Sequence, residues 1–368
     1  MREKLSMLAI IFLMLSGCSI QKEPPIVQPG GIEEPDNLVE EPAEPPTPHV
    51  FTASASNFHF IAGWLDDTQI LYVEKHGAFY KVNYFDIATG ESGLVYEEES
   101  FIIDVLIHPS RDYLLVHTSE DPASAIIKVV GMDGVVKHRV EIDSTELAIE
   151  WNRTNPEKIL LTAFHEDWSF DLFVFDGFDD SLSIIELDDP FPKWAGENNI
   201  MSLLFEDHPL DGGEIQLFRL DTGAVEMTGI GNVIYFDQFN DSFFLDVQAL
   251  DSEEFTYTIR TFDANVVSRW TLPAISNYSE WVVPTVEWID SNRLIVKSAE
   301  KSGQLDEMAS GFNLYMFEEG NSELLLRGLD AGPLNCSPSG RYCLSGYTSE
   351  ELIDVETKEK HKWIIFDN

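Results

Sequence analysis

The stretch Phe218-Arg219-Leu220-Asp221-Thr222-Gly223 is the clearest copy of a turn that recurs along the chain. Strand-forming residues end in an Asp, and a Gly follows two positions later. An Asp side chain accepts a backbone N–H two residues on, and Gly adopts positive φ without strain. The other copies, some of them looser, contain Asp86, Asp133, Asp176, Asp263, Glu318 and Asp354. The mean step along the chain is about 45 residues, which indicates a repeated structural unit.

A second turn signal precedes these copies. An apolar or aromatic residue is followed by a polar turn and then by a strongly apolar strand, as in Trp64-Leu65-Asp66-Asp67 before Leu71-Tyr72-Val73. Similar signals start at His108, Trp151, Trp288 and Cys336, and weaker ones lie near Asn198-Asn199 and Asn240-Asp241. Two turns in fixed order, with strands between them and little helical periodicity, predict an all-β fold. We expect a single β-propeller of about seven four-stranded blades.

Two of these turns carry a family resemblance. The stretches His108-Pro109-Ser110-Arg111-Asp112-Tyr113 and Cys336-Ser337-Pro338-Ser339-Gly340-Arg341-Tyr342 resemble the Ser-Pro-Asp-Gly-x-Tyr hairpin of TolB-type propeller repeats. Ser339 stands where that motif has Asp, and His108 where it has Ser. The resemblance supports the propeller prediction.

The N-terminus predicts export and lipidation. Residues 1–17 combine Arg2 and Lys4 with an apolar run and end before Cys18 in Leu15-Ser16-Gly17, which resembles the lipobox of bacterial lipoproteins. The resemblance implies that Cys18 receives a diacylglyceryl group, and two acyl chains suffice for stable anchoring. The alternative is an ordinary signal peptide with a chance cysteine. Residues 18–50 then form the lipidated cysteine and a disordered tether rich in Pro and Glu.

Lipobox, tether and propeller together resemble the YqgU-like propeller lipoproteins of Gram-positive bacteria. The resemblance implies a lipid-anchored protein on the extracytoplasmic face of the cell membrane, brings no catalytic residues, and offers six blades as the alternative to seven. We place the propeller domain at 51–368. Residues 50–56 are expected to add a strand that helps to close the ring, and the final strand, Lys362–Phe366, to complete the last blade.

The charge is strongly acidic, with 65 Asp and Glu against 23 Lys and Arg, a net charge of −42. Such a field repels phosphate backbones and argues against nucleic-acid binding. Solubility explains the acidity better than a specific cation site does. Weak Ca²⁺ binding stays open, but no D-x-[DN]-x-[DN]-G loop is present, and we predict no cofactor and no metal site.

Cys336 and Cys343 lie on either side of a tight turn. They would face each other across a hairpin and form a disulfide, or they would be two small buried hydrophobic residues. We favour the second interpretation.

The tryptophans fall into two groups. Trp64, Trp151 and Trp288 occupy one repeat position, which favours packing between blades, whereas others do not follow the repeat. Aromatic rings beside carboxylates suit a sugar or a cation. The alternative is that these rings only cover the blade ends. The predicted ligand-binding residues, on loops at one face of the propeller, are His165, Trp168, Trp194, Glu197, Tyr278 and Trp281.

No catalytic motif is present: the sequence has no G-x-S-x-G, no H-E-x-x-H and no phosphate-binding loop. We therefore predict a non-enzymatic binding or scaffold module for a protein, a peptide or a cell-wall glycan. The alternative is a glycan hydrolase or lyase that uses carboxylates at the mouth of the channel. A channel carboxylate with a strongly raised pKa would favour that alternative.

Overall fold

The structure is a computed structural model and describes residues 47–205, 209–250, 253–283, 285–308, 310–318 and 320–367. The predicted signal peptide, Cys18 and most of the predicted tether lie outside the described residues. In the part described, no helix has both the length and the apolar character needed to cross a membrane.

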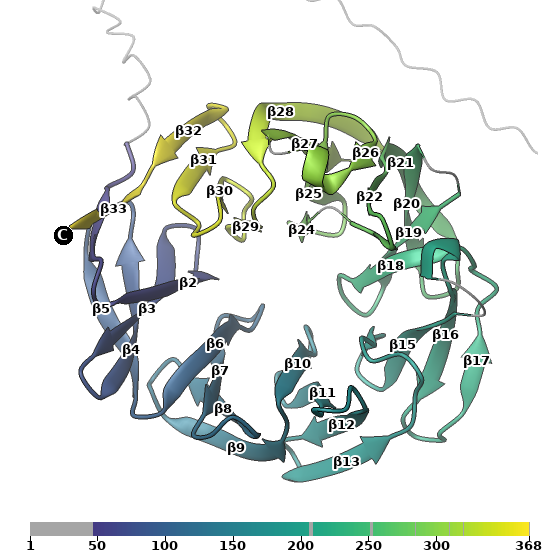
Figure 1. The fold of residues 1–368 in the computed structure, drawn as a ribbon, viewed down its shortest axis with the longest axis horizontal. Coiled ribbons are helices and arrows are strands. Elements are labelled where there is room, and N and C mark those ends of the chain that lie inside the picture. Colours follow the sequence, from purple (N-terminus) through teal and green to yellow (C-terminus); the bar gives the residue numbers. More distant parts are fainter. Residues whose placement is uncertain are drawn as a thin grey trace, which may run out of the picture. The chain divides into compact units, whose positions relative to one another are not determined.

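The described residues contain seven four-stranded antiparallel sheets arranged in a ring (Figure 1). Blades 1 to 3 are formed by consecutive strands: β2 (Phe58–Trp64), β3 (Gln69–His76), β4 (Phe79–Asp86) and β5 (Ser92–Glu98); β6 (Phe101–Ile107), β7 (Tyr113–Ser119), β8 (Ser124–Gly131) and β9 (Val136–Asp143); β10 (Glu146–Trp151), β11 (Lys158–Phe164), β12 (Phe170–Asp176) and β13 (Ser181–Ile185).

Blades 4 to 7 follow the same order from the inner to the outer strand: β14 (Lys193–Trp194), β15 (Asn199–Leu204), β16 (Glu214–Arg219) and β17 (Val225–Met227); β18 (Val233–Gln238), β19 (Phe243–Ala249), β20 (Glu254–Thr261) and β21 (Val266–Pro273); β24 (Val286–Trp288), β25 (Arg293–Ala299), β27 (Ser310–Glu318) and β28 (Asn321–Asp330); β29 (Leu334–Cys336), β30 (Tyr342–Ser345), β31 (Glu351–Asp354) and β32 (Glu359–Lys362). The prediction of a propeller with about seven blades is confirmed.

The recurring turn joins the third and fourth strands of every blade, and it contains an Asp in six blades and Glu318 in blade 6. Its chemistry is the expected one: the Asp86 carboxylate accepts the Ala88 N–H at 2.8 Å, and the Asp354 carboxylate accepts the Glu356 N–H at 2.9 Å. The upstream turn joins the first and second strands, where Asp66 accepts the Thr68 N–H at 2.7 Å. Both kinds of turn lie at one end of the channel, which we call the lower face. The remaining connections lie at the upper face.

A parallel pair of short strands closes the ring. β1 (Phe51–Ser54) pairs with β33 (Ile364–Asp367), and the Phe51 ring packs between Tyr72, Phe85 and Trp363. The expected closing strand near residues 50–56 therefore exists. The expectation that Lys362–Phe366 completes the last blade is wrong, because β32 is the outer strand of blade 7 and the chain then crosses to β1.

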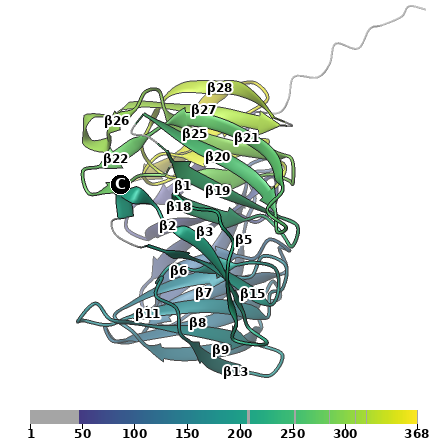
Figure 2. The same ribbon diagram turned by 90° about the vertical axis from the view of Figure 1, so that its right-hand side faces the viewer.

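A small sheet is added between blades 5 and 6 at the upper face. It contains β22 (Ile275–Asn277), β23 (Glu280–Trp281) and β26 (Gly303–Gln304), and two short 3-10 helices lie nearby, η1 (Pro209–Asp211) and η2 (Leu305–Glu307). Figure 2 shows β22 and β26 at one face of the ring.

Candidate functional site

The residue before the last position of each inner strand lines the central channel. Side chains alternate along a strand, so when the last residue packs between blades, the preceding one points to the channel. These seven residues all line one cavity: Gly63, Leu106, Glu150, Lys193, Asp237, Glu287 and Asn335. Four consecutive blades thus contribute a charged side chain to the wall of the channel.

Two arginines from the lower turns complete this channel cavity. Arg111 lies between β6 and β7, Arg153 lies between β10 and β11, and both line the same space of about 440 Å³. The cavity therefore opens toward the lower face. Its size is within the range of small-molecule sites.

Lys193 is the centre of an ion-pair network. Its Nζ lies 3.4 Å from a carboxylate oxygen of Glu150 and 3.4 Å from one of Asp237. Burial alone would lower the pKa of Lys193, but these two negative charges outweigh that effect and raise it. The pKa of Glu150 is raised because the loss of hydration outweighs the attraction of Lys193.

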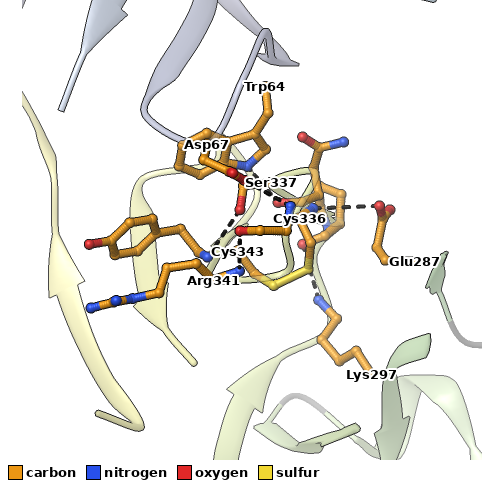
Figure 3. Close-up of a disulfide and its surroundings, with 12 residues drawn as sticks. Trp64, Asp67, Glu287, Lys297, Cys336, Ser337, Arg341 and Cys343 are labelled. Atoms are coloured by element: carbon orange, nitrogen blue, oxygen red, sulfur yellow. Dashed lines mark hydrogen bonds between the residues drawn. A yellow bond between two sulfur atoms is a disulfide. The ribbon is translucent and has the colours of Figure 1, made fainter. Parts of the chain in front are cut away.

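Glu287 is half-buried on the opposite wall. Burial raises the pKa of Glu287 to about 7, and the charge of Asp237 adds to this rise. The charges of Arg153 and Arg111 act in the other direction. The Cys336 N–H donates to the Glu287 carboxylate at 3.5 Å, as Figure 3 shows. Glu287 is thus a carboxyl group that changes its protonation state near neutral pH.

The arginine side of the cavity is less completely paired. Arg111 Nη1 donates to the Trp64 carbonyl oxygen at 2.6 Å. Arg153 Nε is shielded from solvent and has no hydrogen-bond partner among the described residues. The charge of Arg153 also lowers the pKa of Arg111, after the larger effect of burial. The positive charges of Arg111 and Arg153 thus line the cavity, and among the described residues no carboxylate forms an ion pair with either of them. This is unusual in a chain of net charge −42.

Hydrogen bonds from tryptophan indole groups hold three of the channel residues in place. Trp194 Nε1 donates to the Glu150 carbonyl oxygen at 2.9 Å, and Trp64 Nε1 donates to the Asn335 carbonyl oxygen at 3.0 Å. Trp288 Nε1 donates to the Asp237 carboxylate at 3.1 Å. Each bond links neighbouring blades. The charged ring is therefore held by a rigid support, as a preorganised site requires.

The predicted ligand-binding residues are not brought together. His165 and Trp168 lie in the turn between β11 and β12 at the upper face, and Trp168 is 85% exposed. Tyr278 lies in the added sheet and donates its hydroxyl to Asp306 at 3.1 Å. Trp281 is half-buried, with Nε1 donating to the Leu210 carbonyl oxygen. Ligand binding at these four residues stays a prediction.

Trp194 and Glu197 require a correction. Trp194 is the last residue of β14 and is 1% exposed, so it lies at the same packing position as Trp64, Trp151 and Trp288 and not on an exposed loop of the upper face. Glu197 is exposed in the following turn, at the lower face and away from Trp168. The inner strand of blade 4 therefore ends at Trp194, whereas the sequence analysis placed Trp194 on a loop.

The cysteines also differ from the favoured interpretation. Cys336 and Cys343 pair directly across β29 and β30 and form a disulfide (Figure 3). Cys336 lines the channel cavity, so the disulfide supports the wall beside Glu287. Within the described ranges, no group of three or more His, Cys, Asp or Glu residues is arranged to hold a metal ion.

Comparison with known proteins supports the lipoprotein and propeller predictions. Residues 86–346 match the model of the YqgU-like 6-bladed beta propeller domain. The uncharacterized lipoprotein YqgU of Bacillus subtilis is 23% identical over 322 residues, which cover 86% of this chain and 87% of that protein. The matched span leaves parts of blades 1 and 7 outside, and the described residues form seven blades where the family description has six.

Solved structures show the same fold. The uncharacterized protein lmo1340 of Listeria monocytogenes superimposes with a TM-score of 0.80 at 19% identity, covering 87% of this chain and 98% of that one. The β-propeller domain of the Trilobed protease of Pyrococcus furiosus, described as having an open velcro topology, gives a TM-score of 0.55 at 12% identity over 84% of this chain and 99% of that one. These similarities concern the fold.

Proposed function

Since the chain belongs to the YqgU-like 6-bladed beta propeller domain family, we propose that it is a lipoprotein anchored at the extracytoplasmic face of the membrane whose propeller binds a short zwitterionic peptide. The anchor is the diacylglyceryl group on Cys18, and the binding site is the channel cavity at the lower face. The similarity to a protein named as a lipoprotein supports the anchor.

The buried Nε of Arg153, which has no hydrogen-bond partner among the described residues, is the observation that carries the choice of ligand. Arg111 and Arg153 lie on blades 2 and 3, whereas Asp237 and Glu287 lie on blades 5 and 6, across the channel. A guanidinium group binds a carboxylate with two parallel hydrogen bonds. A peptide with a free carboxylate would thus satisfy the arginines, and its amino group would face the carboxylates. The cavity accommodates only a few residues.

A second candidate function is a glycan hydrolase or lyase. It is favoured by Glu287, because a carboxyl group whose pKa lies near 7 beside a second carboxylate, Asp237, has the properties of a general acid. This candidate predicts new reducing ends when the full chain is incubated with purified cell-wall glycan. Their release should disappear in Glu287→Gln. If no glycan is cleaved over a wide pH range, this candidate is rejected.

The peptide proposal is tested with trialanine and trialanine amide as probes. Calorimetry on the full chain in detergent should show that trialanine binds, and that the amide, which lacks the carboxylate, binds at least tenfold more weakly. Arg153→Gln should abolish the difference between the two peptides. Arg139→Gln is the matched control, since Arg139 is exposed on β9 and pairs with Glu141 at 2.9 Å. Equal affinities for the two peptides in the native protein would refute the proposal.

A further inference from the structure

A second cavity, of about 560 Å³, lies at the upper face between blades 2 and 3. Its walls come from the inner strands β6 and β10, from β7 and β8, and from the chain that connects the two blades. Leu106 and Ile149 line both this cavity and the channel cavity, so the two spaces lie back to back. We call it the blade 2–3 cavity.

A β-bulge opens the apolar wall of this cavity. The register between β6 and β7 shifts between Ile102 and Asp104, which leaves Ile103 as the extra residue. A bulge changes the direction in which side chains point. Phe101 and Ile103 remain 48% and 43% exposed, and both line the cavity. Apolar surface is therefore available to a bound molecule.

One repeat position distinguishes blade 2 from the others. In each blade the last residue of the inner strand pairs with a residue of the second strand, and the position in question is the third residue after that partner. The seven blades place there Val73, His117, Thr162, Leu203, Val247, Lys297 and Gly346. Thr162 Oγ1 donates to the Pro190 carbonyl oxygen at 2.8 Å, and Lys297 Nζ donates to the Pro333 carbonyl oxygen at 3.2 Å. Both acceptors belong to the connection that leads to the next blade.

His117 lacks such a partner. Its side chain is buried, with 6% exposed, and its Nε2 makes no hydrogen bond within the described part of the chain. His117 lines the blade 2–3 cavity. Burial lowers the pKa of His117 to about 4, so the ring is neutral at neutral pH. A buried polar atom without a partner is rare and requires an explanation.

The chemistry of the missing partner follows from the repeat. In blades 3 and 6 the partner is an amide carbonyl oxygen. An amide group would satisfy His117 in either tautomer, because it offers a C=O to an Nε2–H and an N–H to a bare Nε2. Among the described residues no such group bonds to His117 Nε2, and His117 lines the open blade 2–3 cavity.

The rest of the lining selects a neutral ligand with hydroxyl groups. The cavity wall contains the carboxylates of Asp104 and Glu146 and no Lys or Arg. Carboxylates repel anions and accept hydrogen bonds from hydroxyl groups. Burial raises the pKa of Asp104, although part of its side chain still reaches solvent. Phe101 and Ile103 offer apolar surface to the face of a sugar ring and to a methyl group.

We propose that the blade 2–3 cavity binds a neutral N-acetylated sugar, with its acetamido group on His117 and its hydroxyl groups on Asp104 and Glu146. This site does not use the arginines or the carboxylates of the channel cavity. The sugar proposal is therefore independent of the peptide proposal, and the failure of one would not affect the other.

The test uses N,N′,N″-triacetylchitotriose as the probe and cellotriose, which lacks the amides, as its match. Calorimetry on the full chain in detergent should show that chitotriose binds and that cellotriose binds at least tenfold more weakly. His117→Val introduces the residue found at this position in blades 1 and 5 and should weaken chitotriose binding at least tenfold. Thr162→Val is the matched control at the same position of blade 3 and should bind as the native protein does, as should Arg153→Gln.

A second measurement does not depend on a variant. In the native protein, the ¹⁵N resonances of the His117 ring should shift when chitotriose is added and stay in place with cellotriose. Equal binding of the two sugars, no binding of either, or unchanged affinity in His117→Val would overturn the proposal. Binding of N-acetyl-trialanine methylamide without binding of chitotriose would also overturn it, in favour of a peptide amide.

Discussion

The charge of Glu287 should make the protein less stable as the pH rises, and Glu287→Gln should remove this effect. Burial raises the pKa of this carboxyl group from 4.5 to about 7 in the folded protein. The folded state therefore holds the proton more tightly than the unfolded state does. The free energy of unfolding therefore falls between about pH 4.5 and pH 7, because only the unfolded state loses the proton in this range.

The size of the effect follows from the shift in pKa. Each pKa unit corresponds to about 1.4 kcal/mol, so the full cost of ionising Glu287 in the folded protein is on the order of 3 kcal/mol. About 2.5 kcal/mol of this cost should appear between pH 5 and pH 8. A glutamine keeps an oxygen that accepts the Cys336 N–H but carries no charge. The variant should thus gain stability relative to the native protein as the pH rises.

Urea unfolding of the two proteins at several pH values from 5 to 8 measures the difference. Glu280→Gln serves as the control, because this glutamate is exposed on β23 and its replacement should not change the pH dependence. If the difference in free energy of unfolding between Glu287→Gln and the native protein stays constant over this range, the inference that burial raises the pKa of Glu287 is refuted.

Other predictions concern the anchor, the disulfide and two tryptophans. Cys18→Ala should move the protein from the membrane fraction to the soluble fraction, and equal membrane association would contradict lipidation. Replacing both Cys336 and Cys343 by Ser should lower the free energy of unfolding by about 2.5 kcal/mol, and a reductant should do the same to the native protein but not to the variant. Trp194→Ala should cost about 3–5 kcal/mol, since it empties a buried site and removes the bond to Glu150. Trp168→Ala should change stability by less than about 0.5 kcal/mol, so a comparable loss in both variants would contradict their different positions.

The architecture was predictable because the turns that separate strands depend on local chemistry. An Asp whose side chain accepts a nearby backbone N–H favours a turn, and the spacing of these turns indicates the number of blades. Blade 4 was harder to place because its inner strand, β14, has only two residues and therefore shows no alternating pattern. As a result, Trp194 was assigned to a loop although it ends an inner strand.

Part of the channel cavity could also have been found. Glu150 and Glu287 directly precede Trp151 and Trp288, and alternation along a strand turns the preceding residue toward the channel when the tryptophan packs between blades. The lack of a hydrogen-bond partner for Arg153 Nε and His117 Nε2 among the described residues carried no such signal. It depends on which groups of the neighbouring blade lie close to these atoms, and the sequence does not show this. The disulfide likewise depended on the exact register of β29 and β30.

The strand that closes the ring is also the first strand of the propeller. If Cys18 is acylated as predicted, tension between the membrane and the propeller first meets the hydrogen bond from the His49 N–H to the Ile87 carbonyl oxygen and then acts on β1. Four paired positions hold β1 parallel to β33. The lipid anchor and the closure of the propeller would then be mechanically coupled, and a force strong enough to detach β1 would remove one of the contacts that close the ring, while the bond from Trp64 to Asn335 would still link blades 1 and 7.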